Sequence, residues 1–150
     1  QLSAGFNVTY MHTEQDLYSN IDGQLFDTSF NRPTDQLQGA SPFLMNANIN
    51  YSPTKWENYK PVASLVFSYF SDRIDALGSG QIGNIIEKGV PTLDFIWKNK
   101  FGENTELNLK AQNLLDPNIT RVREGTPIGD VTLSEFQIGM NISLSFKYNF

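Results

Sequence analysis

The chain has 150 residues, a formal net charge of −5 and a pI near 4.7, and its eleven basic residues are scattered, so it lacks the basic stripe with which proteins displace counterions from nucleic acid. It contains no cysteine, which excludes disulfides and Cys-ligated metal sites. Aromatic residues reach 13% while charged residues make up only 18%, a composition that suits strands with one apolar and one polar face.

Two strands are predicted in the first third of the chain. Apolar side chains occupy the even positions from Leu2 to Tyr10, and small or polar ones occupy the odd positions. A long connection rich in Gly, Asp, Asn and Pro follows over residues 14–41, as expected of a loop. Residues 43–51 then alternate between apolar side chains and mostly asparagine, which predicts the second strand.

Three further strands are predicted in the middle of the chain. Residues 62–70 carry apolar side chains on both parities, so the sequence predicts a strand there but leaves its facing open. Residues 92–101 and 105–113 alternate more regularly, and the polar parity of the second segment is strongly charged. Residues 102–105 read as a tight turn that joins these two strands into a hairpin.

Residues 136–150 give the clearest pattern. Apolar side chains hold every even position from Phe136 to Phe150, and small or polar residues hold every odd one, without a break. A strand in a soluble sandwich usually spans about 5 or 6 residues. An alternation as long as this one therefore needs a larger apolar medium on one side. Lipid outside and water inside would supply the two environments.

The connections between these six strands alternate in length. Residues 14–41, 73–91 and 114–132 form long connections, whereas residues 52–60 and 102–104 form short ones. Outer-membrane barrels combine long extracellular loops with short periplasmic turns. The pattern therefore predicts an all-β fold, the wall of an antiparallel transmembrane β-barrel, with the C-terminus on the periplasmic side.

Six strands are too few to close such a barrel. No apolar run reaches the roughly 18 residues of a transmembrane helix, and the mean hydropathy of −0.34 still suits a barrel, because only every second residue faces lipid. An open six-stranded sheet in lipid would leave two edges of unpaired backbone groups, and single-chain barrels need at least about 8 strands. Either several copies of the chain assemble or the chain is part of a longer one; since Gln1 opens directly on a strand pattern, we expect residues 1–150 to be the C-terminal portion of a longer barrel.

Three stretches resemble the C-terminal strands of TonB-dependent outer-membrane receptors. Residues 108–117, NLKAQNLLDP, resemble the penultimate strand and loop start, where an Asn-Leu-Leu/Phe-Asp sequence recurs. Residues 37–47, LQGASPFLMNA, resemble the family's C-terminal third. Residues 137–144, QIGMNISL, followed by terminal Phe150, look like the assembly signal of outer-membrane barrels: polar, any, Gly, two of any, apolar, any, apolar.

This resemblance implies the last six strands of a barrel of about 22 strands, plugged by an N-terminal domain and contacting TonB through a segment outside these residues. The implied function is energised uptake of a scarce nutrient, such as a metal chelate, vitamin or glycan, across the Gram-negative outer membrane. Two alternatives stay open. One is a receptor-like barrel that serves as a structural or assembly subunit beside a surface lipoprotein or other outer-membrane subunits; the other is a passive porin-like channel.

The assembly signal implied by this resemblance consists of Gln137, Gly139, Ile142, Leu144 and Phe150. During insertion the last strand would be held by a strand edge of the barrel-assembly machinery, and such β-augmentation draws specificity from alternate side chains. Gly139 suits this role because a missing side chain permits close backbone approach. The alternative is that all five residues are ordinary residues of the barrel wall.

Side-chain chemistry adds two sets of candidates. The aromatic residues expected in the belts at the membrane interfaces, with ordinary strand packing as the alternative, are Trp56, Tyr59 and Trp97. The long connections are expected to carry binding, and cations there could hold an anionic chelate or a sugar acid. The candidates, for which simple loop solubility is the alternative, are Arg73, Arg121 and Arg123.

We expect no enzyme, cofactor or metal site in this chain. The one histidine, His12, is expected at the surface near a strand end, and no Ser/His/Asp constellation or nucleophile elbow accompanies it. Residues 78–83 fit a Gly-x-Gly-x-x-Gly string by spacing alone and are predicted to be a flexible loop. Four acidic residues without the spacing of a Ca²⁺ loop are expected to be solvated: Asp72, Asp75, Glu124 and Asp130.

Overall fold

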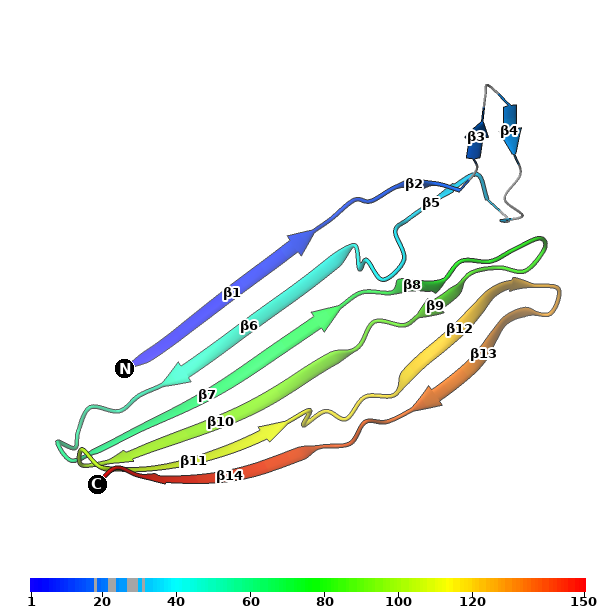
Figure 1. Cartoon of the computed structure of the whole chain (residues 1–150). Coiled ribbons are helices and arrows are strands. Elements are labelled where there is room, and N and C mark those ends of the chain that lie inside the picture. The colour runs from blue at the N-terminus through cyan, green and yellow to red at the C-terminus, as the bar shows by residue number, and fades with distance from the viewer. Residues whose placement is uncertain (18, 22–23, 27–29, 31) are drawn as a thin grey trace.

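The computed structural model of the chain describes residues 1–17, 19–21, 24–26, 30 and 32–150. Every regular element in this part of the chain is a strand, and the strands pair in antiparallel fashion. The largest sheet has six strands in the order β1-β6-β7-β10-β11-β14 (Figure 1). Their bounds are β1 Leu2–Tyr10, β6 Phe43–Tyr51, β7 Tyr59–Phe70, β10 Pro91–Phe101, β11 Thr105–Gln112 and β14 Asn141–Tyr148.

These six strands confirm the six that the alternation predicts, and each one pairs with the next predicted strand along the chain. The short connections 52–58 and 102–104 lie at one end of the sheet, which we call the short-turn end. Both chain ends are tied there, since Gln1 N bonds to Ser52 O at 2.6 Å and Asn149 N to Asn104 O at 2.9 Å. The long connections all leave from the opposite end (Figure 1).

The long connections contain strands that the sequence analysis did not predict. A second sheet, in the order β13-β12-β9-β8, continues beyond the six-stranded sheet (Figure 1); we call it the hairpin sheet. Its strands are β8 Arg73–Ala76, β9 Ile85–Glu87, β12 Ile119–Thr126 and β13 Gly129–Phe136. Two smaller ladders join β2 (Gln15–Asp16) to β5 (Thr34–Asp35) and β3 (Ser19–Ile21) to β4 (Gln24–Phe26), in the long connection whose residues 18, 22–23, 27–29 and 31 lie outside the described part.

The predicted unbroken strand over residues 136–150 is wrong. The chain forms β13 up to Phe136, leaves strand geometry, and resumes as β14 at Asn141. Gly139 has a φ of +87°, which ends extended geometry and which L side chains rarely adopt. Alternation continues across this break because Ile138 and Met140, which lie in the break, keep the even positions apolar between Phe136 and β14, so the sequence pattern alone conceals the change of partner from β12 to β11.

Strand register gathers the apolar parities of all six strands onto one face of the sheet. One continuous row of paired residues crosses it: Leu2, Tyr51, Ala63, Trp97, Leu109 and Leu144. A neighbouring row on the opposite face is mostly polar: Ser3, Asn50, Ser64, Ile96, Lys110 and Ser143. The register thereby settles the facing of β7, whose residues Ala63, Leu65, Phe67 and Tyr69 belong to the apolar face.

Candidate functional site

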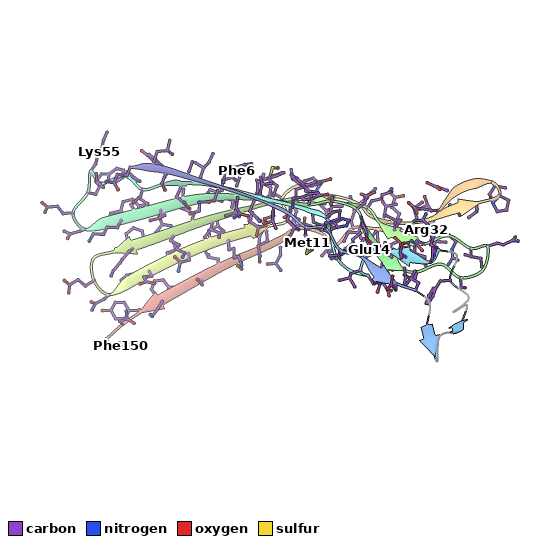
Figure 2. All side chains as sticks on the ribbon, turned by 90° about the horizontal axis from the view of Figure 1, so that it is seen from above. Phe6, Met11, Glu14, Arg32, Lys55 and Phe150 are labelled. Carbon is purple, nitrogen blue, oxygen red and sulfur yellow. The ribbon has the colours of Figure 1, made fainter. Side chains whose placement is uncertain are left out.

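The apolar face of the six-stranded sheet is uncovered. Figure 2 shows a single layer of strands with side chains projecting from both sides. Phe6 on β1 is 70% exposed, and Leu144 and Phe146 on β14 are each 68% exposed. A continuous exposed apolar surface of this kind marks contact with a partner or with a membrane.

Aromatic side chains collect on this face at the short-turn end. Tyr59 lies 5.5 Å from Trp56 and stacks on Phe101 at 4.9 Å between ring centroids. At the edge strand, Tyr148 contacts the ring of Phe150 at 5.1 Å. The three predicted belt residues are brought together in one shallow groove of about 190 Å³, lined by Tyr51, Pro53, Trp56, Tyr59, Pro61, Ala63 and Trp97.

A second aromatic group lies on the same face at the opposite end of the strands. Phe43 and Tyr69 are 6.3 Å apart, and Tyr10 pairs with Phe43 across β1 and β6. Tyr59 and Tyr69 both belong to β7, and ten residues span about 33 Å along a strand, or about 25 Å across a membrane at the tilt of barrel strands. This separation matches the height of the apolar band of outer-membrane barrels, which is about 25 Å.

One polar side chain is buried on the apolar face. Asn99 is only 3% exposed, and an unsatisfied amide there would be costly. Tyr59 donates its hydroxyl to Asn99 Oδ1 at 2.8 Å, and Asn99 Nδ2 donates to the carbonyl of Leu107 at 3.2 Å. Tyr59 therefore joins the aromatic cluster to a satisfied hydrogen-bond network, which fixes its ring position.

The hairpin sheet holds two of the three candidate arginines around one buried carboxylate. Glu87 on β9 is 6% exposed and receives Arg73 Nη2 at 2.6 Å and Arg121 Nη2 at 3.3 Å. Arg121 Nε lies 3.6 Å from Asp75 Oδ2, and the Arg73 guanidinium sits 4.9 Å from the ring of Phe70. The cationic charge of both arginines is thus largely balanced inside the protein.

Arg123, the third candidate, lies apart from this cluster. It belongs to β12 and pairs by backbone with Ile85 and Val131. Within the described part of the chain its half-exposed side chain forms no ion pair. Its charge is therefore the one that stays available to an external anion.

Asp72 and Lys88 form an exposed ion pair where the hairpin sheet meets the six-stranded sheet. Lys88 Nζ lies 2.8 Å from Asp72 Oδ2, and Gly89 N donates to Asp72 Oδ1 at 2.7 Å. Partial burial raises the pKa of Asp72, but the hydrogen bonds from Lys88 and Gly89 outweigh it, so the pKa is lowered on balance. The hydrogen bond to Asp72 raises the pKa of Lys88 against a smaller effect of burial.

Asn84 organises the tip of the β8–β9 hairpin. It is 1% exposed; its Oδ1 accepts from Gly78 N at 2.8 Å and its Nδ2 donates to Asp35 Oδ2 at 2.6 Å. A Cβ at Gly83 would overlap the carbonyl of Glu124. Residues 78–83 therefore form a turn whose end glycines, Gly78 and Gly83, are buried while residues 79–82 are exposed, and the contacts with Asp35 and Glu124 join segments that lie far apart in the chain.

Two of the motifs singled out in the sequence bind each other. Asp116 Oδ1 accepts from Gly139 N at 2.9 Å, and Asp116 O accepts from Gln137 Nε2 at 3.1 Å. Asn113 Nδ2 donates to Gly139 O at 3.0 Å, while Asn113 N donates to Asp94 Oδ1 at 2.9 Å. We call these contacts the Asn113–Asp116 clasp; they hold the break between β13 and β14 in place.

The remaining residues of the predicted assembly signal lie on one exposed edge strand or just beyond it. Ile142 and Leu144 belong to β14 and are each 68% exposed, and Phe150 follows the end of the strand in full exposure. A Cβ built at Gly139 meets no atom within 4 Å. Inside this chain, positive φ rather than close approach accounts for the glycine.

Three more acidic residues singled out in the long connections also have partners. Asp75 contacts Arg121, Glu124 lies 3.9 Å from Arg32, and Asp130 accepts from Gly125 N. His12 is exposed and lies 3.9 Å from Glu14. No group of three or more His or acidic side chains is placed to hold a metal within the described residues.

No helix among the described residues has the length and apolarity to cross a membrane. Comparison of the chain with protein-family models, with curated proteins and with solved structures gave no match.

Proposed function

We propose that the chain is part of the wall of an outer-membrane β-barrel, with the apolar face of the six-stranded sheet toward lipid and the polar face toward the lumen. The register that gathers the apolar parities of all six strands onto one face supports this most strongly. The aromatic groups at both ends of that face agree with interfacial belts. The hairpin sheet then lies on the extracellular side and the short turns, with the C-terminus, on the periplasmic side.

Closure of such a wall requires further strands. β1 and β14 each have one pairing partner in the six-stranded sheet, and an unpaired edge costs several kcal/mol per backbone group where water is absent. A longer barrel of the TonB-dependent receptor type, of about 22 strands around a plug, would satisfy both edges. The function that follows is energised uptake of a scarce nutrient.

Single cysteines test the membrane facing, because the chain itself has none. In the full-length protein, made cysteine-free elsewhere and reconstituted in vesicles, fluorophores at Leu65 and Leu109 should be quenched by brominated lipid. Fluorophores at their neighbours Ser64 and Asn108 should instead be quenched by iodide. Equal quenching by lipid at all four positions would contradict the proposed facing.

Conductance separates the uptake receptor from the passive channel. A plugged receptor in a planar bilayer should show no steady open-channel current, whereas a porin-like channel conducts continuously. Energised uptake further requires that a deletion strain lose growth on one limiting chelate, vitamin or glycan. An uncoupler should cause the same loss of uptake in the parent strain. A deletion strain with unchanged growth on every nutrient would favour the structural-subunit role.

Ligand contact by the hairpin sheet is proposed for Arg123 ahead of Arg73 and Arg121. The latter two are already engaged by Glu87 and Asp75, so an anion would have to displace these carboxylates. Arg123→Gln should weaken binding of an anionic nutrient, whereas Arg73→Gln should mainly loosen the hairpin sheet. Unchanged affinity in Arg123→Gln would remove it as a contact.

We also propose that the last strand is read by the barrel-assembly machinery through Gln137, Gly139, Ile142, Leu144 and Phe150. Exposure of Ile142 and Leu144 on an edge strand supports this, because an edge can accept a partner strand. Deletion of Phe150 in the full-length protein should lower outer-membrane levels more than Phe136→Ala, which removes an aromatic ring from β13. Equal outer-membrane levels in both variants would show that these five residues are ordinary residues of the barrel wall.

A further inference from the structure

A lysine cluster lies on the polar face of the six-stranded sheet, near the short-turn end. The register aligns four charged residues in one row across β7, β10, β11 and β14: Lys60, Lys100, Glu106 and Lys147. Lys98 occupies the next row of the same face, opposite Val62 and Asn108. These two rows therefore hold four cations and one carboxylate.

This arrangement is unfavourable without an anion. Lys60 and Lys100 are directly opposite each other, and like charges in that position destabilise a sheet. Within the described residues, no lysine of the cluster forms an ion pair. The excess of positive charge is confined to this part of the molecule. The long connections 11–42, 71–90 and 113–140 hold twelve of the sixteen acidic residues but only five of the eleven basic ones.

The cluster surrounds an open groove of about 350 Å³, lined by Lys60, Val62, Lys98, Asn99, Lys100, Glu106 and Asn108. Three lysines and one glutamate give this lining an excess of two positive charges at neutral pH. A volume of this size accommodates a small molecule. Ammonium groups act as point charges that bind phosphate or carboxylate oxygens, and the Asn108 amide can donate a further hydrogen bond.

We propose that this groove binds a compact polyanion, a phosphate or polycarboxylate group with at least two negative charges, through Lys60, Lys98 and Lys100. Such a ligand neutralises the charge excess and removes the repulsion between Lys60 and Lys100. Register and charge alone define the site, so it does not depend on the proposed membrane function.

Calorimetric titration of the full-length protein in detergent at low ionic strength tests the site. Pyrophosphate and citrate serve as probes for the two kinds of oxygen anion. Lys98→Gln and Lys100→Gln should each weaken binding about tenfold, since one charge-assisted contact is lost. Lys110→Gln, which removes an equal charge from the same face outside the groove, should change affinity less than twofold.

The unfolding midpoint separates loss of the site from loss of the fold. Lys100→Gln should raise this midpoint, because it relieves the contact with Lys60, while it weakens binding. Saturable binding of pyrophosphate alone assigns the groove to phosphates, and binding of citrate alone assigns it to polycarboxylates. Absence of saturable binding for both probes, or an equal loss in Lys110→Gln, would overturn the proposal.

Discussion

The hairpin sheet is formed by the long connections of the six-stranded sheet, but the two sheets are stabilised differently. In the first sheet, the strands are mostly longer and alternate between apolar and polar side chains except in β7, and many side chains of the apolar face are exposed. The second sheet has shorter strands held by ion pairs and buried polar side chains, with Glu87 and Asn84 among the most buried residues. The first sheet depends on an external apolar medium, whereas the second contains its own polar interactions.

The largest expected effect tests that dependence. Leu65→Arg in the full-length protein, placing a cation on the apolar face of β7, should lower the free energy of unfolding in lipid vesicles by about 3 kcal/mol. Ser64→Arg, one residue away on the polar face, should change it by less than about 0.5 kcal/mol. Denaturant titration followed by Trp fluorescence measures both variants. Similar losses in the two would mean that the faces are not in different environments.

A smaller effect is expected in the hairpin sheet. Glu87→Gln removes the charge that balances Arg73 and Arg121, which should cost about 2 kcal/mol, less than for a fully buried pair because both arginines are partly exposed. Hydrogen exchange should accelerate in β8, β9 and β12 and stay unchanged in β1 and β6. Glu124→Gln is the matched control, since its contact with Arg32 is long. Acceleration spread over both sheets would show that they unfold as one unit.

The junction between β13 and β14 should respond to backbone conformation. Gly139→Val should cost about 1.5 kcal/mol because its φ of +87° is unfavourable for a β-branched residue. Gly139→Asn should cost less than half as much, because asparagine tolerates positive φ and the space around the Cβ is open. Thermal unfolding of the full-length protein compares them. An equal loss in both variants would instead indicate that any side chain obstructs a partner there.

The smallest effect concerns the pair Asp72–Lys88. The pKa of Asp72 is lower in the folded protein than its value of 3.8 in the unfolded chain. Asp72 therefore stabilises the fold fully above pH 3.8, and this stabilisation is lost as the pH falls through the folded pKa. The pKa of Lys88 is higher in the folded protein than 10.5, so Lys88 stabilises the fold fully below pH 10.5 and loses this effect as the pH rises through the folded pKa. The exposed pair is worth less than about 1 kcal/mol.

The Gly89 amide donates a hydrogen bond to Asp72. Lys88→Gln should therefore speed hydrogen exchange of this amide relative to the parent protein at pH 6. The difference should shrink at pH 3 and at high salt. A difference that stays constant at low pH would show that Lys88 protects this amide by packing and not by pairing with the Asp72 charge.

The sequence predicts most of the six-stranded sheet because alternation is a local signal, and the positions of five strands follow from it, whereas the strand predicted over residues 136–150 runs across the break between β13 and β14. It does not reveal the facing of β7, since both parities of residues 62–70 are partly apolar; only pairing with β6 and β10 decides it. Strands β8 and β9 are missed because they have only four and three residues, and β12 and β13 because charged side chains interrupt their alternation. Their partners, such as Glu87 for Arg121, are far apart in the chain.

The candidate site follows the same division. Trp56, Tyr59 and Trp97 could be chosen from side-chain chemistry, and the structure gathers them in one groove. The pairing of Arg73 and Arg121 with a shared carboxylate could not be foreseen, because it requires three strands to meet. The lysine cluster was also missed, since its members become neighbours only through the register of β7, β10 and β11.

The formal charge of the polar side of the molecule differs between its two ends. Acidic residues dominate the long connections, whereas Lys60, Lys98 and Lys100 lie near the short-turn end. The formal charge along the strands therefore becomes more positive from the hairpin sheet toward the short turns. Because charges act on mobile ions only within a Debye length of about 8 Å at physiological salt, a small anion is held where it meets the lysines, and a small cation is held among the acidic long connections.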